Sequence, residues 1–68
     1  MLTIKNRRIR AEQALATYSD DDPATNLVDF LADAMHWCRA EGHDFADLLG
    51  TAEMHFQEEF FEEEGTYP

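Results

Sequence analysis

Three histidines and the only cysteine of this chain are the side chains typical of a zinc site. They are His36, Cys38, His43 and His55, which lie within twenty residues. Zinc binds imidazole and thiolate in a tetrahedral arrangement, so a site requires these groups to converge. On a helix, His36 and Cys38 would lie about 160° apart around the axis. We therefore predict no metal site, and we expect Cys38 to be a small buried apolar residue.

Two pairs of side chains have a spacing that would suit proton transfer. Asp33 with His36, and His55 with Glu58, are three residues apart and would share a helix face. Acid–base catalysis also requires a cleft that excludes water, and 68 residues folded as helices leave little room for one. Both pairs are interpreted as surface contacts. The chain is predicted not to be an enzyme, with no catalytic residues and no cofactors.

Two acidic clusters dominate the rest of the chain. One is Asp20–Asp22, and the other lies within Glu58–Glu64. The formal net charge is −10; residues 1–19 carry four basic side chains against Glu12, a net +3, which leaves −13 for residues 20–68. Such a body repels nucleic acid and anionic lipid and favours basic protein surfaces. We expect a protein partner with a basic surface, and direct nucleic-acid binding is unlikely on this charge balance.

The charge spacing of the second cluster resembles that of a phosphate backbone. Five glutamates over six helical steps give roughly one charge per 1.8 Å, close to the roughly 1.7 Å of duplex DNA. This spacing permits nucleic-acid mimicry, whereas the alternative is a solvated run that only keeps the protein soluble. Aromatic residues beside these charges add a possible protein-binding patch. The predicted partner-binding residues are Asp20, Asp21, Asp22, Glu58, Glu59, Phe60, Phe61, Glu62, Glu63 and Glu64.

The best-specified helix runs from Asp22 to Glu41. Asp22 is a good N-cap, Pro23 suits the first helical position, and Gly42 is a typical stop. Its apolar residues cover an arc of roughly 180°, more than one neighbouring helix covers. We therefore expect a homodimer. These residues are Leu27, Val28, Phe30, Leu31, Ala34, Met35, Trp37 and Cys38.

A further helix is expected from Asp44, its N-cap, to about Gly65, with a possible break at Gly50. The connection through Gly42 and His43 is short, which favours an antiparallel helical hairpin over residues 22–64. The far ends of the two helices would then coincide, and both acidic clusters would meet there. We call this expected arrangement the acidic pole.

The N-terminal stretch is expected to form a third helix over about Thr3–Tyr18, or else a flexible arm within residues 1–19. As a helix antiparallel to the next, it would place its basic residues about 15 to 20 Å from the acidic pole. Four basic residues without interleaved aromatics are weak evidence for nucleic-acid binding. The predicted fold is therefore all-α: one domain over residues 1–68, a hairpin with an N-terminal third helix, and a tail at 65–68.

The remaining composition indicates the cellular setting. A single cysteine excludes an internal disulfide framework and agrees with a reducing compartment. No apolar run is long enough to cross a membrane. The expected location is the cytoplasm.

A further pattern within residues 36–56 consists of His36-Trp37-Cys38, Gly42, Asp44-Phe45, Leu48, Ala52 and His55-Phe56. This pattern resembles small acidic uncharacterised proteins encoded by bacterial phages, plasmids and integrative elements. It implies a bacterial mobile-element setting and no site residues. The sequence thus predicts a non-enzymatic accessory or regulatory protein that binds a basic protein surface, with inhibition of a host nucleic-acid-binding or defence protein as one form of this function. The alternative is a self-associating structural domain whose acidic run only keeps it soluble.

Overall fold

The computed structural model describes residues 3–64, with side chains over residues 3–62, and consists of three helices. They are α1 (Ile4–Leu15), α2 (Pro23–Glu41) and α3 (Phe45–Glu64). The described part contains no strand. The predicted all-α class is confirmed, and the N-terminal stretch is a helix rather than an arm. The predicted tail at 65–68 lies outside the described residues.

Local hydrogen bonds explain where α1 begins and ends. The Thr3 hydroxyl accepts a bond from the Asn6 backbone N–H at 3.1 Å and so caps the first turn. At the other end, the Tyr18 N–H donates to the Leu15 carbonyl at 3.0 Å, which turns the chain out of the helix. The helix is therefore three residues shorter at its C-terminal end than the sequence predicts.

The ends of α2 are those predicted. The Asp22 carboxylate accepts from the Ala24 N–H and from the Thr25 hydroxyl, each at 3.1 Å. Gly42 adopts φ = 77°, a left-handed conformation that a residue without Cβ tolerates best. This conformation allows the His43 N–H to reach the Cys38 carbonyl at 2.8 Å, which satisfies a carbonyl at the helix end.

Helix α3 begins where Asp44 accepts from the Asp47 N–H at 3.3 Å. It then continues through Gly50 without a break as far as Glu64. The Thr51 hydroxyl bonds to the Asp47 carbonyl within the same turn. The possible break at Gly50 is therefore absent from the structure, because a single glycine weakens a helix but keeps every backbone donor it needs.

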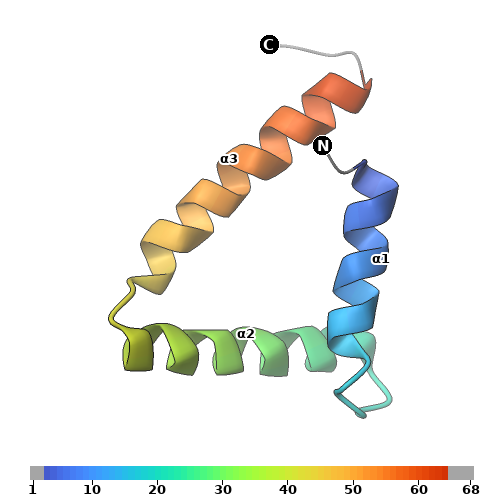
Figure 1. Cartoon of the computed structure of the whole chain (residues 1–68). Coiled ribbons are helices and arrows are strands. Elements are labelled where there is room, and N and C mark those ends of the chain that lie inside the picture. Colours follow the sequence, from blue (N-terminus) through green and yellow to red (C-terminus); the bar gives the residue numbers. More distant parts are fainter. Residues whose placement is uncertain (1–2, 65–68) are drawn as a thin grey trace.

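The three helices form the sides of an open triangle (Figure 1). Helices α2 and α3 meet at Gly42 and His43 and then diverge. They do not run side by side, so the predicted antiparallel hairpin is wrong. Helix α1 bridges the two open ends, running from the end of α3 to the beginning of α2. A short connection brings only the adjoining helix ends together. It leaves the angle between the helices to side-chain contacts made farther along.

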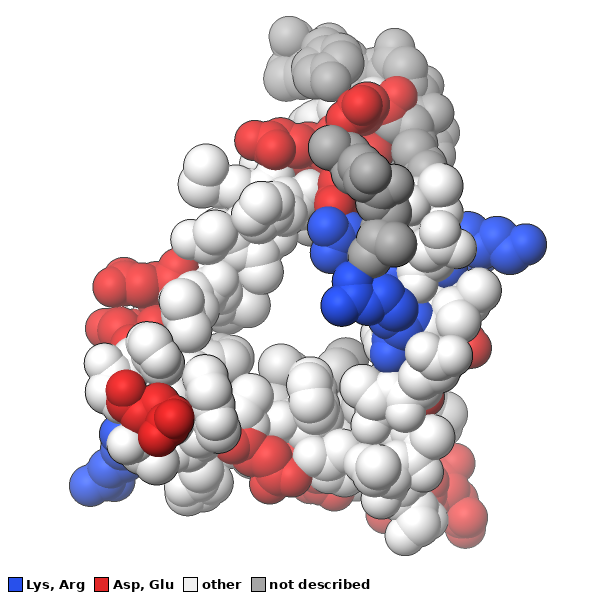
Figure 2. Space-filling view, viewed as in Figure 1, with Lys and Arg blue, Asp and Glu red and all other residues white. Residues whose placement is uncertain are grey.

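The open arrangement leaves the molecule little interior. Cys38, at 5% exposure, is the one buried hydrophobic residue in the described part. The radius of gyration is 14.0 Å, whereas a compact chain of this length has about 11 Å. Figure 2 shows a gap through the middle of the triangle. Large apolar residues that stay exposed include Leu27, Val28, Leu31, Met35, Trp37, Leu48, Leu49, Met54, Phe56 and Phe60.

Candidate functional site

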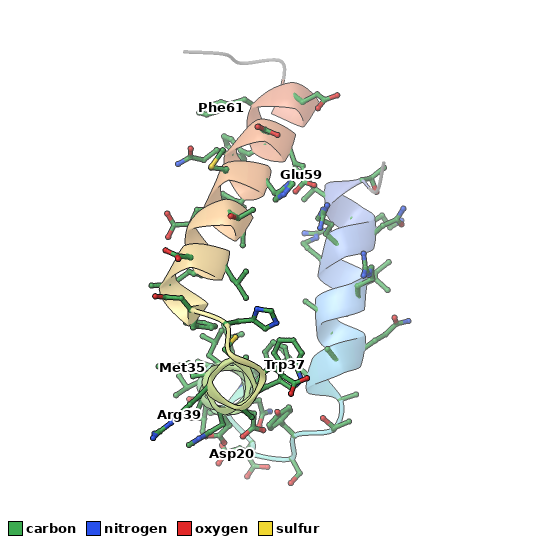
Figure 3. All side chains as sticks on the ribbon, turned by 60° about the vertical axis from the view of Figure 1, so that its left-hand side comes forward. Asp20, Met35, Trp37, Arg39, Glu59 and Phe61 are labelled. Atoms are coloured by element: carbon green, nitrogen blue, oxygen red, sulfur yellow. The ribbon has the colours of Figure 1, made fainter. Side chains whose placement is uncertain are left out.

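The acidic residues of the two clusters do not converge. Asp20 lies at the corner between α1 and α2, whereas Glu59 and Phe61 lie near the far end of α3 (Figure 3). The predicted acidic pole is therefore wrong, because α2 and α3 diverge from their shared corner. Acidic side chains instead occupy all three corners of the triangle (Figure 2). By position these corner residues are Asp20–Asp22; Glu41, Asp44 and Asp47; and Glu58, Glu59 and Glu62.

Two of the three carboxylates in Asp20–Asp22 already accept hydrogen bonds within the chain. The Asp20 carboxylate accepts from the Asp22 N–H at 2.8 Å. The Asn26 side chain accepts from the Asp20 N–H at 2.9 Å and donates to its carbonyl at 3.0 Å. Since Asp22 also caps α2, Asp21 is the exposed member whose side chain is best suited to an external partner.

One of the predicted partner-binding glutamates faces inward. Glu59 forms an ion pair with Arg7 of α1 at 2.6 Å, and its side chain is only 12% exposed. The basic helix therefore contacts the acidic end of α3, rather than lying 15 to 20 Å from the acidic cluster as predicted. Because the Arg7 side chain is 45% exposed, solvent screening limits the pair to less than about 1 kcal/mol. Glu58 and Glu62 point into solvent.

The aromatic residues of α3 form a row along the helix. Phe56 stacks on Phe60 with ring centroids 6.1 Å apart, and Phe60 meets Phe61 edge-on at 5.6 Å. Phe60 is 43% exposed, whereas Phe61 is half-buried. Phe56 is 65% exposed, although its position in the apolar stripe suggests a core residue. An apolar patch thus lies next to the acidic end of α3.

A contact that the sequence does not predict joins the segment after α1 to α2. The Tyr18 hydroxyl donates to the Asp33 carboxylate at 2.5 Å, and its ring packs edge-on against Phe30. This hydrogen bond raises the pKa of the Tyr18 phenol above its ordinary value, with partial desolvation and the charges of Asp33 and Asp29 adding to the shift. The sequence contained one signal for this contact, which was that Tyr18 continues the apolar stripe of the N-terminal helix.

His36, Cys38 and His43 line one open hollow at the corner between α2 and α3, whereas His55 lies farther along α3. Cys38 is buried, and His43 stacks on Trp37 with centroids 5.5 Å apart. Within the described residues, no three His, Cys, Asp or Glu side chains gather closely enough to hold a metal ion. The same residues contain no helix that is both long and apolar enough to cross a membrane.

Two hollows of about 270 Å³ open on the inner side of the triangle. The first lies between α1 and α2, with Ala14, Leu27 and Phe30 in its wall. The second lies between α1 and α3, beside Ala11 and Phe56. Both are mainly apolar, with arginines at their edges, and they contain no arrangement of nucleophile, acid and base. They indicate packing surfaces rather than an enclosed site.

Comparison with known proteins adds no relative from which a function could be transferred. No protein-family model matches the chain, and no curated protein or solved structure has significant similarity to it.

Proposed function

We propose that this is a non-enzymatic accessory or regulatory protein that binds a basic surface on a protein partner. The observation that carries the proposal is the charge distribution: a net charge of −10 with acidic side chains at all three corners. Four of the five basic residues lie on α1, and one of them is already paired with Glu59. A surface of this kind attracts cationic partners and speeds their association.

The end of α3 is the corner best suited to a partner. It combines the exposed carboxylates of Glu58 and Glu62 with the exposed ring of Phe60. An apolar patch rimmed by charge is typical of protein interfaces. Since Glu59 is paired internally, the proposed nucleic-acid mimicry rests on the outward glutamates and not on an unbroken row. The proposed setting is the cytoplasm of a bacterium, where a mobile element would encode such an inhibitor.

Charge reversal at this corner tests the proposal. The parent protein is immobilised, partners are captured from bacterial lysate at low salt, and they are identified as the salt concentration rises. Glu58→Lys with Glu62→Lys should weaken capture of the identified partner at least about tenfold, because it removes complementary charge. Glu12→Lys with Glu53→Lys is the matched control, since it changes the net charge by the same four units elsewhere on exposed helix surface.

Equal losses in the two double variants would show that only net charge matters and would contradict a site at the end of α3. Duplex DNA added to the captured complex separates the mimicry version from other basic partners. A partner that is released by the DNA binds both through one surface, as mimicry requires. A partner that stays bound contradicts mimicry but leaves the basic-surface proposal standing.

The second candidate function is a self-associating structural domain whose acidic run only keeps it soluble. The exposure of large apolar residues on α2 and α3 favours it. Under this candidate, both charge variants capture as much as the parent, and the only protein recovered is the chain itself.

A further inference from the structure

Helix α2 carries an apolar row that no other helix of the chain covers. Val28 is 63% exposed, Met35 is 54% exposed and Leu31 is 37% exposed. Together with Ala24 they follow one another at steps of four, three and four residues. This is the spacing with which a helix packs along a second helix. We call these four residues the α2 stripe.

The α2 stripe lies on one side of the triangle. Met35 and Trp37 point to opposite sides of α2, and Arg39 lies on the same side as Met35 (Figure 3). The residues between them on the helix surface, Leu27 and Cys38, face the other helices of the chain. Met35 also lines an open hollow with Phe45 at the corner between α2 and α3, but more than half of its side chain stays exposed to a partner.

The surface area of the chain indicates that this partner is large. The accessible area is 5813 Å², whereas a compact monomer of this mass exposes about 4400 Å². The excess of roughly 1400 Å² is greater than the roughly 800 Å² that each partner buries in a stable interface of standard size. One additional interface of standard size would remove more than half of this excess.

We propose that a second copy of this chain covers the α2 stripe, with the two α2 helices packed antiparallel about a two-fold axis. The stripe is complementary to itself in this orientation. When residues whose numbers sum to 59 face each other, Val28 lies opposite Leu31 of the other copy and the small Ala24 lies opposite the large Met35. A two-fold interface requires such self-complementarity, and here it places small against large side chains at both ends of the row.

The charges at the two ends of the stripe agree with the same register. Arg39 follows Met35 by one helical turn, and in this register it lies beyond the first residue of α2 in the second copy, where Asp20, Asp21 and Asp22 precede that helix. No ion pair of Arg39 is present within the described part of the chain. The two-fold axis forms this contact twice. Arg39 is the one basic residue at that end of α2, which also has Glu41 and Asp44. A parallel two-fold arrangement would instead place Arg39 beside Arg39 of the other copy.

The test is the mass of the full chain in solution, measured by light scattering or sedimentation over a range of concentrations. The parent should be a dimer of twice 7.9 kDa. Met35→Glu should raise the dissociation constant roughly 100-fold or more, because it places two unpaired charges in the interface. Met54→Glu is the matched control, since Met54 is similarly exposed at 61% but lies on α3. It should leave the dimer intact.

A charge exchange tests the antiparallel register. Arg39→Asp should weaken the dimer, and adding Asp21→Arg to it should restore the parent affinity, because the opposite charges then face each other again. Asp21 is chosen because Asp20 and Asp22 have structural hydrogen bonds.

Three outcomes would overturn the proposal. They are a monomeric parent at high concentration, a dimer that resists Met35→Glu but dissociates with Trp37→Glu, and equal dissociation by Met35→Glu and Met54→Glu. Circular dichroism checks that the variants are folded. Both glutamate variants replace exposed residues with a good helix former, so they should retain the parent helix content. None of these measurements depends on the basic partner, so either proposal can fail alone.

Discussion

At the scale of single residues, two polar contacts join α1 and the segment that follows it to the other two helices. Tyr18 donates to Asp33 of α2, and Arg7 pairs with Glu59 of α3. Both contacts are partly exposed, so neither one is strong alone. The predicted candidate site changes accordingly: Asp20, Asp22 and Glu59 have structural contacts, whereas Asp21, Glu58 and Glu62 remain free to act outward.

The Tyr18–Asp33 hydrogen bond makes stability depend on pH in the alkaline range. Because the pKa of Tyr18 is higher in the folded state than its ordinary value of 10.0, the bond stabilises the fold fully below about pH 10. This stabilisation is lost as the pH rises through the raised pKa. Tyr18→Phe should lower the melting temperature at pH 7 and should approach the parent above pH 10. Thermal melts of both proteins from pH 7 to 11 measure the difference, and a gap that stays constant would contradict the contact.

At the scale of helices, the two internal glycines have opposite roles. Gly42 ends α2 in a left-handed conformation, whereas Gly50 lies inside α3 in an ordinary helical conformation. A Cβ added at either position would meet nothing within 4 Å. Backbone conformation alone therefore decides the effect of a methyl group at each position.

The same substitution should thus have opposite effects at these glycines. Gly50→Ala should increase the free energy of unfolding by about 1 kcal/mol, because alanine favours the helix. Gly42→Ala should decrease it by about 1 to 2 kcal/mol, because a side chain is strained at positive φ. Urea unfolding followed by circular dichroism measures both. If Gly50→Ala is instead destabilising, α3 is broken or closely covered at Gly50.

At the scale of the whole molecule, the open triangle and the exposed apolar surface have one explanation. A chain of 68 residues buries little surface alone, and this one leaves much of α2 and α3 uncovered. A second copy on the α2 stripe covers the exposed apolar row of α2 and brings Asp20–Asp22 next to Arg39 of the other copy, while the acidic end of α3 stays outside. Self-association and binding of a basic partner are therefore compatible, since they use different surfaces.

The shape of the isolated chain can be measured on the monomeric variant. Met35→Glu should scatter X-rays with a radius of gyration near 14.0 Å, because the contacts that hold the triangle do not involve Met35. The parent dimer should give a larger value. A value near 11 Å, typical of a compact chain of this length, would show that the helices collapse into a closed bundle and would contradict the triangle.

The sequence by itself determined the helices, because their ends depend on neighbouring residues. Asp22, Pro23, Gly42 and Asp44 fix ends through bonds and conformations that span a few positions. The sequence also determined the net charge and the width of the apolar arc on α2. Only Gly50 was ambiguous, since one glycine costs too little to decide whether a helix continues.

The tertiary structure alone decided how the helices are arranged, and with it which charges come together. The connection at Gly42 and His43 is compatible with many angles between α2 and α3. The angle that occurs depends on Tyr18 meeting Asp33 and Arg7 meeting Glu59, which are pairs far apart in the sequence. Each such contact contributes little free energy, so many alternative pairs of side chains would be almost equally stable. No local pattern could therefore show that the acidic clusters lie at separate corners, or that the α2 stripe is left uncovered.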